Sequence, residues 1–284
     1  MDTKDQPDET AVLRSEVRRL RGVLNRLTPS LAVMLRRRGF TIDKKEPHDD
    51  LLIPERRFIE GYYEMLKRYS FRLFLRDVIK HQPVFRLAQV TRYATREVTQ
   101  EYIDYLILTG IVSLEHDGYR LRRGPIKSFG ETLEWFLAEI FVREFSAEAT
   151  WGVKMKKRAI GGDYDLLAKI DGDILCMEIK SSPPRQIYQK EVRAFLGRVE
   201  DLQPAIAVFF DDTELRMKDK IVPMFEEELK SMFAQPPEVG RIEKELFGLS
   251  GASFGKSAVF IMNAKDSIIN NVERVLAEYF RRVT

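Results

Sequence analysis

The stretch Gly161–Lys180 reads G-G-D-Y-D-L-L-A-K-I-D-G-D-I-L-C-M-E-I-K. Two strand-like runs flank Asp171-Gly172, a dipeptide typical of a two-residue hairpin turn. Because side chains alternate between the two faces of a strand, Glu178 and Lys180 share one face. The hairpin is expected to bring Asp165, at the start of the first strand, next to Glu178. Two carboxylates and one ammonium group at a sheet edge suit a hard cation such as Mg²⁺ and a phosphate ester.

A simpler interpretation is that Glu178 and Lys180 form a solvated pair, as most surface charges do. Two features oppose it: the charges interrupt an apolar strand, and Ser181-Ser182-Pro183-Pro184 ends that strand abruptly. The spacing alone leaves both interpretations open.

The same residues resemble a known family. Asp165, a spacer and then Glu178-Ile179-Lys180 resemble the D…(D/E)-x-K signature of the PD-(D/E)XK nuclease superfamily, which includes type II restriction enzymes and archaeal Holliday-junction resolvases. The resemblance covers residues 129–210 and implies a restriction-endonuclease-like αβββαβ core. It implies Asp165, Glu178 and Lys180 as catalytic residues, with Mg²⁺ or Mn²⁺ held by the two carboxylates and the carbonyl of Ile179. Tyr164 stands where the family usually has proline.

The segments around the signature fit that core. An apolar stripe at helical spacing predicts a helix over 128–145, and a strand is expected over 149–156. The resemblance implies that a glutamate of this helix supports the metal. Glu134 is our choice, and a solvated helix glutamate is an equal alternative. We further expect a helix over 185–200, in which the resemblance implies that Tyr188 and Gln189 orient the scissile strand. A buried strand is expected over 205–210, parallel by analogy with the family. Asp211-Asp212 is expected to cap the following helix.

Residues 55–127 are predicted to form a winged helix-turn-helix. Helices are expected over 71–80, 87–93 and 96–109, with Thr95 as the cap of the third, followed by two strand-like runs. L-I-L-T-G-I-V-S-L-E-H-D-G-Y-R-L, residues 106–121, resembles the passage from recognition helix to wing. Such modules bind DNA or another protein, and Thr99 or Gln100 is a candidate base reader. The predicted DNA-binding residues of the whole chain are Arg92, Arg96, Arg120, Arg122, Arg123, Lys154, Lys156, Lys157 and Gln189.

The N-terminal segment, residues 1–54, carries leucines and other apolar residues at heptad spacing from Leu13 to Met34. A dimerising coiled coil and a pair of helices packed on the protein's own core both explain this pattern. Thr28-Pro29 is expected to start a helix, and residues 41–54 read as a polar linker. Residues 128–284 would form the nuclease-like domain. Within it residues 236–256 read as a loop, and their G-A-S-F-G-K-S lacks the spacing of a nucleotide-binding P-loop.

The composition of the chain restricts its compartment and the kinds of site it can contain. The chain has 284 residues, a net charge of +3 and a single cysteine, which excludes an intramolecular disulfide and favours a reducing cytoplasmic compartment. No apolar run approaches the length of a membrane span, and the three histidines show no zinc spacing. The sequence therefore predicts an α/β (α+β) protein in which a winged helix targets a metal-dependent DNA endonuclease with a mixed sheet flanked by helices. The alternative is a non-catalytic DNA-binding regulator that keeps a nuclease-like scaffold.

Overall fold

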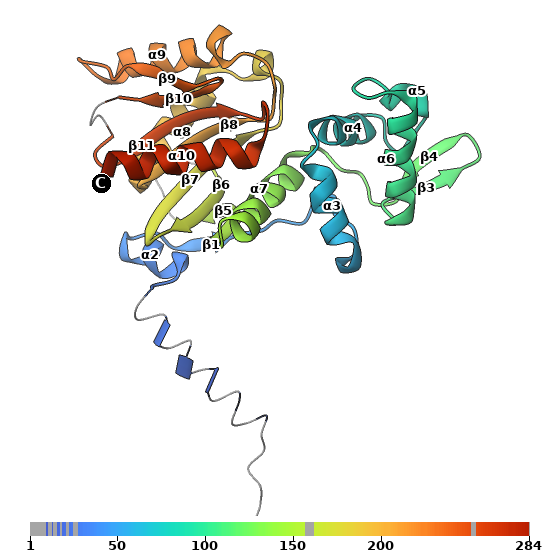
Figure 1. Cartoon of the computed structure of the whole chain (residues 1–284), viewed down its shortest axis with the longest axis horizontal. Helices are drawn as coiled ribbons and strands as arrows, with labels where there is room; N and C mark the ends of the chain where they lie inside the picture. The colour runs from blue at the N-terminus through green and yellow to red at the C-terminus, as the bar shows by residue number, and fades with distance from the viewer. Residues whose placement is uncertain are drawn as a thin grey trace, which may run out of the picture.

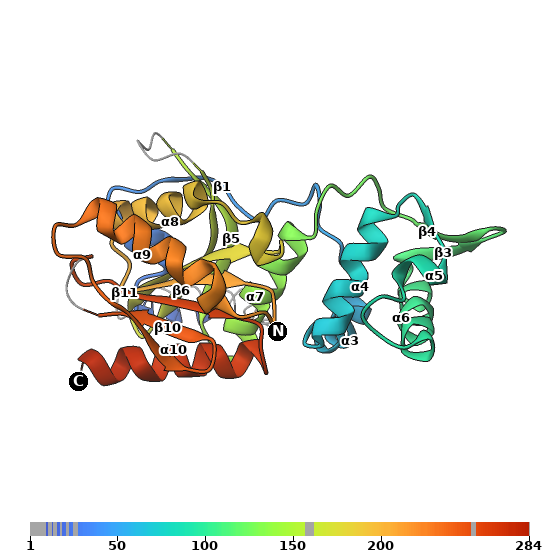
Figure 2. The same cartoon turned by 90° about the horizontal axis from the view of Figure 1, so that it is seen from above.

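The computed structural model describes residues 28–156, 162–250 and 254–283, and eight further positions between 10 and 24. The chain is a mixed α/β protein. A large sheet flanked by helices lies beside a smaller, mainly helical part, and helix α7 (Gly130–Glu144) lies between them (Figures 1 and 2).

The large sheet has eight strands in the order β1-β5-β6-β7-β8-β11-β10-β9. Strands β7, β8 and β11 are parallel to one another, and every other neighbouring pair is antiparallel. The strands are β1 (Ile42–Lys44), β5 (Glu148–Met155), β6 (Tyr164–Ile170), β7 (Asp173–Lys180), β8 (Ile206–Asp211), β9 (Val239–Glu243), β10 (Leu246–Leu249) and β11 (Ala258–Asn263). The mixed sheet and its flanking helices are confirmed.

Helices cover both faces of this sheet (Figure 2). Leu175, Met177 and Ile179 of β7 belong to a core that includes α7 and α10 (Ile268–Val283). On the opposite face, Ala207 and Phe209 of β8 pack under α8 (Gln189–Leu202) and α9 (Ile221–Met232). This two-sided burial explains why the parallel strands read as nearly continuous apolar runs.

The smaller part contains four helices and a three-stranded sheet of order β2-β4-β3. Its elements are α3 (Ile59–Leu66), α4 (Tyr69–Lys80), β2 (Val84–Phe85), α5 (Leu87–Val90), α6 (Arg96–Leu108), β3 (Val112–Glu115) and β4 (Gly118–Leu121). The Thr95 hydroxyl accepts a hydrogen bond from Val98 N at 3.3 Å, as expected of the cap of α6. The predicted second helix is shorter than expected, and β2 was not predicted.

A buried ionic clamp joins the two parts. Arg72 of α4 is 1% exposed and donates from Nη2 to Asp212 Oδ1 at 2.8 Å, and Arg76 also binds this carboxylate. Asp212 follows β8, and its backbone N–H donates to the carbonyl of Lys180 at 2.8 Å. The expectation that Asp211-Asp212 caps a helix is therefore wrong. Asp211 ends the strand, and Asp212 neutralises the buried Arg72, which is 140 residues away in sequence, and the partly buried Arg76.

Three further expectations need correction. Helix α2 (Leu31–Arg37) begins after Ser30 rather than at Pro29, and the Thr28 hydroxyl donates to Leu24 O at 3.0 Å. The supposed linker contains β1 and buries Leu51 and Leu52, so it belongs to the fold. The supposed loop over 236–256 contains β9 and β10, because a short antiparallel pair extends the sheet beyond β11.

Candidate active site

The hairpin of β6 and β7 brings the signature residues together. Leu166 pairs with Met177 and Leu167 with Cys176, so Asp165 lies opposite Glu178 in the same register. Asp171 and Gly172 form the turn with φ values of 47° and 91°, the left-handed conformation that a two-residue hairpin requires. The predicted juxtaposition of the two carboxylates is thus present.

Glu178 is 5% exposed, and both of its oxygens have cationic partners. Lys180 Nζ lies 2.8 Å from Oε1, and Arg198 of α8 binds Oε2. Lys180 also lies 3.2 Å from Glu191 Oε1. Burial alone would lower the pKa of Lys180, but the adjacent Glu178 carboxylate more than offsets this, so the pKa is raised. Lys180 is therefore a fixed cation at the end of β7.

Asp165 is held from the neighbouring strand, because the backbone N–H of Ile179 donates to its Oδ2 at 2.7 Å. Burial and the nearby Glu178 raise the pKa of Asp165 to about 8. Burial and the charges of Asp165 and Glu131 raise the pKa of Glu134, on α7, to about 9. Carboxylates forced together in this way favour a bound cation, which would stabilise their ionised forms.

The residues fit one mode of metal binding. In the described ranges, no three aspartate, glutamate, histidine or cysteine side chains are close enough to enclose a metal ion. Mg²⁺, however, is often bound by one or two protein carboxylates and completed by substrate phosphate and water. Asp165 and Glu178 supply such a pair, and Ile179, the predicted carbonyl ligand, lies between Glu178 and Lys180 on β7.

Asp211 is a further carboxylate at this edge that sequence reasoning did not place in the site. It lies opposite Lys180 in the parallel pairing of β7 and β8 and is fully buried. Neither of its oxygens has a hydrogen-bond partner within the described structure. Burial and the neighbouring Asp212 raise the pKa of Asp211 to about 8.

Two residues of α8 were also missed. Glu191 and Arg198 contact Lys180 and Glu178 from the face of the helix that carries buried Phe195. They are spaced by seven residues, close to two helical turns, so they share one stripe with the apolar residues. The signal in the sequence that could have identified Glu191 and Arg198 is their position within the apolar stripe of the helix.

The predicted DNA-binding arginines of the smaller part are spread along the chain. The side chains of Arg92, Arg96 and Arg122 are exposed. Arg120 Nε lies 3.2 Å from Glu115 Oε1. Arg123 donates to Leu51 O at 2.8 Å and so joins the two segments of chain that connect the parts. Their contact with DNA stays a prediction. Thr99 is fully buried and cannot read bases, because its hydroxyl donates to Thr95 O at 2.8 Å.

The predicted basic run near the first strand is only partly described. Lys154 lies 3.4 Å from Asp163, Lys156 lies 3.7 Å from Asp43, and Lys157 falls outside the described residues. The side-chain amide of Gln189 donates to Met224 O at 2.8 Å and so joins α8 to α9. A role for Gln189 with the scissile strand stays a prediction.

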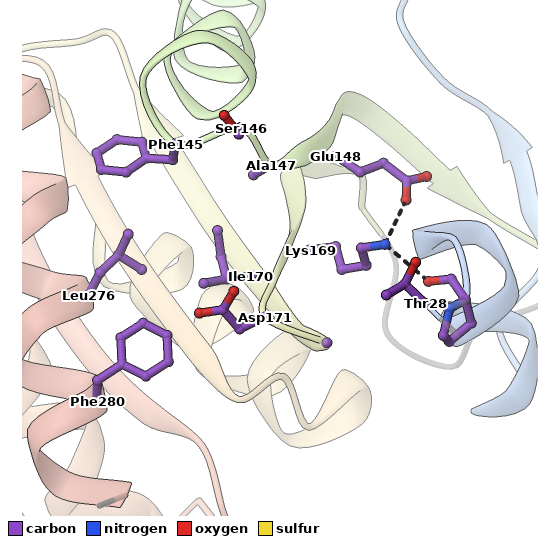
Figure 3. Close-up of a pocket in the computed structure, with 12 residues that line it drawn as sticks. Thr28, Phe145, Ser146, Ala147, Glu148, Lys169, Ile170, Asp171, Leu276 and Phe280 are labelled. Atoms are coloured by element: carbon purple, nitrogen blue, oxygen red, sulfur yellow. Dashed lines mark hydrogen bonds and ion pairs between the residues drawn. The ribbon is translucent and has the colours of Figure 1, made fainter. Parts of the chain in front are cut away.

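A large pocket lies at the opposite end of the hairpin. Its volume is about 790 Å³, and the turn at Asp171 and the side chains of Phe145 and Phe280 line it (Figure 3). Lys169 in this pocket is paired with Glu148 at 3.7 Å and donates to Pro29 O at 3.3 Å. Asp165 lies at the other end of β6, about 20 Å from this turn at the rise of a strand. The pocket is therefore separate from the paired carboxylates.

Comparison of the sequence with protein families gives no match, and comparison with curated proteins gives none. Comparison with solved structures gives similar chains, among them two of low sequence identity. Protein VC1899 from Vibrio cholerae has 13% identity and a TM-score of 0.48, aligned over 89% of this chain and 62% of that one. Can2 from Sulfobacillus thermosulfidooxidans, in complex with cyclic tetra-adenylate, has 11% identity and a TM-score of 0.49, with coverages of 88% and 61%. The chain thus spans about three-fifths of the length of both. No helix in the described ranges is both long and apolar enough to traverse a bilayer.

Proposed function

We propose that this protein is a metal-dependent nuclease that hydrolyses phosphodiester bonds in DNA. The observation that carries the proposal is the placement of Asp165 opposite Glu178, with Lys180 two residues further along the same strand face. These three residues resemble the PD-(D/E)XK signature, and the position of Asp165 and Lys180 beside Glu178 supports the proposal.

The smaller part supports targeting to DNA. The order α4, β2, α5, α6, β3, β4, with β4 in the middle of the small sheet, agrees with a winged helix-turn-helix. We propose that this part, residues 55–127, contacts DNA through the exposed cations of α6 and the β3–β4 hairpin.

Each side chain has a chemical role in this proposal. Asp165 and Glu178 would hold Mg²⁺ or Mn²⁺, which supplies Lewis-acid polarisation of the phosphoryl oxygen and lowers the pKa of water. Lys180 presents a fixed ammonium group that orients the attacking water and offsets negative charge on the transition state. Arg198 fixes the orientation of Glu178 by binding its second oxygen. Ile179 N–H fixes Asp165 in the same way.

The decisive experiment incubates the protein with plasmid, single-stranded and four-way-junction DNA, in Mg²⁺ or Mn²⁺ and in EDTA. We expect metal-dependent cleavage of at least one substrate, and none by Asp165→Ala. Asp171→Asn, at the other end of the same hairpin, is the matched control and should cleave like the wild type. Equal cleavage by wild type and Asp165→Ala would refute the proposal.

One observation favours the alternative, a DNA-binding regulator without catalysis. Both oxygens of Glu178 are already neutralised by Lys180 and Arg198, as in a purely structural ion cluster. In that case DNA would be retained in a gel-shift assay, and no metal would produce cleavage of any of the three substrates.

A further inference from the structure

A second pocket of about 650 Å³ opens between the two parts, directly beside the end of β7. From the smaller part it is lined by the end of α4, Arg92, Tyr93 and Lys127, and from the sheet part by residues 128–129, 181–183, 185–186 and 215. Its cationic side chains are Arg76, Lys80, Arg92, Lys127 and Arg185, and we call this pocket the basic groove.

The lining of the basic groove is strongly one-sided in charge. Five cations line it, of which Arg76 is already paired with Asp212, and Asp77 is the one acidic residue among the described residues that line it. Asp77 is only 8% exposed, and Lys80 and Arg92 both act on its carboxylate. A cleft lined by one sign of charge concentrates the potential and attracts a ligand of the opposite sign.

The position of the basic groove links it to the signature residues. Ser181 and Ser182 line it and follow Lys180 without a gap in the chain. Arg76 lines it too and binds Asp212, whose N–H donates to the carbonyl of Lys180. A polyanion lying in this groove would therefore reach the end of β7 where the carboxylates are.

The cations come from both parts of the molecule. Lys80 and Arg92 belong to the smaller part, whereas Arg185 follows β7 in the sheet part. Tyr93 also lines the groove, is 41% exposed and has the Arg92 guanidinium 5.2 Å from its ring centroid. Phosphates spaced along a strand match several separate cations from two parts of the molecule better than one compact anion does.

We infer that the basic groove binds the phosphate backbone of the nucleic acid substrate and leads it from the smaller part to Asp165 and Glu178. This inference rests on the proposed function and adds a contact surface to it. Of the cations of the groove, the sequence had pointed only to Arg92; Arg76, Lys80, Lys127 and Arg185 are new.

The test measures binding of labelled DNA by fluorescence anisotropy in EDTA, over a range of salt concentrations. The variant is Lys80→Gln/Arg185→Gln, which removes one exposed cation from each part. We expect binding to weaken about tenfold or more at low salt, and the slope of log K against log salt to fall by about 0.9 per lost contact on duplex or about 0.7 on single strands.

Lys230→Gln/Lys256→Gln is the matched control, since it removes the same charge at exposed positions outside the groove. It should bind with the wild-type slope. Unchanged thermal unfolding of both double variants establishes that the fold is intact.

The outcomes separate this inference from the proposed nuclease activity. In the first outcome, the wild type binds DNA, the groove variant binds more weakly, and neither cleaves. The inference about the basic groove is then supported and the nuclease assignment fails. If the wild type cleaves and the groove variant binds within about twofold with an unchanged slope, the groove is refuted and the nuclease stands. A wild type that binds no DNA overturns both.

Discussion

Lys180 is the residue on which the proposed rate enhancement depends most. Its ammonium is held by Glu178 at 2.8 Å and Glu191 at 3.2 Å, so it is already oriented before any substrate arrives. A positioned donor at a developing charge typically contributes a factor of about 10²–10³ in rate. Its counterpart at the other end of the hairpin, Lys169, is also ion-paired but lies far from the carboxylates.

Replacing Lys180 by methionine should therefore slow DNA cleavage about 100-fold and leave DNA affinity in EDTA within about twofold, because it acts mainly in the transition state. Single-turnover rates and anisotropy titrations measure the two effects separately. Lys169→Met serves as the control and should change neither. A Lys180→Met variant that loses affinity and rate in equal proportion would show that the lysine binds substrate instead.

The acidic cluster predicts a pH dependence of stability. The pKa of Asp165 rises from its ordinary 3.8 to about 8 on folding, so the folded protein binds a proton more tightly than the unfolded chain. Its contribution to stability is complete at low pH and is lost as the pH rises from about 4 to about 8. Glu134, with a folded pKa of about 9, acts in the same direction.

In EDTA, the melting temperature should consequently fall between about pH 5 and pH 9, and Asp165→Asn should show a smaller fall. Each kcal/mol lost corresponds to about 2–4 °C for a protein of this size. Added Mg²⁺ should reduce the fall in the wild type, since it favours the ionised carboxylates. If the melting temperature of Asp165→Asn changes with pH as steeply as that of the wild type, with and without Mg²⁺, the pKa assigned to Asp165 is contradicted.

At the scale of elements, helix α4 and strand β8 depend on each other through Arg72 and Asp212. Both side chains are almost completely buried, at 1% and 0% exposure. Burial alone would raise the pKa of Asp212, but Arg72 and Arg76 lower it overall. Removing one partner of such a pair leaves an uncompensated buried charge.

Asp212→Asn should cost about 3–5 kcal/mol in the free energy of unfolding, measured by urea denaturation. The control is Glu278→Gln, which breaks pairs with Arg281 and Arg282, whose side chains are 72% and 35% exposed. That change should cost less than about 1 kcal/mol. Equal small losses in both variants would mean that the clamp contributes little.

The sequence predicts an element when the residues that determine it are close together in the chain, and fails when they are far apart. Strands β5 to β8 and helices α7 and α8 follow from contiguous apolar patterns, and the β6–β7 register follows from Asp171-Gly172. The short strands β1, β9 and β10 could not be found in this way, because polar residues are frequent around them and their pairing depends on strands that a local pattern does not reveal. The Arg72–Asp212 contact spans 140 residues and leaves no local pattern at all.

At the scale of the whole molecule, the row of apolar residues near the N-terminus bears on self-association. In the described positions, Leu13, Val17, Leu20 and Leu24 are between 46% and 63% exposed. These four residues therefore do not pack on the protein's own core. Leu31 and Met34, at the end of the same row, are 2% and 8% exposed and do pack on it, so the interpretation that the row packs on the core holds for α2 alone. A second copy of the chain is the partner that heptad spacing fits.

We expect the full chain to form a homodimer, with twice its monomer mass of 33.2 kDa by light scattering. A variant without residues 1–27 should be a monomer, because it lacks the exposed row. The double variant Leu13→Glu/Leu20→Glu should dissociate the dimer without deleting any residue, since it places charges within the apolar row. A monomeric full chain at micromolar concentration would contradict the expectation.

The clamp at Asp212 also limits how the chain can be recombined. A hybrid that keeps the sheet but takes residues 55–127 from another protein would lack the arginines that pair with Asp212. The Asp212 carboxylate would then be buried without a counter-ion. Such hybrids should be recovered in soluble form only when the donor segment brings two arginines at the positions of Arg72 and Arg76, or when Asp212 is made apolar at the same time.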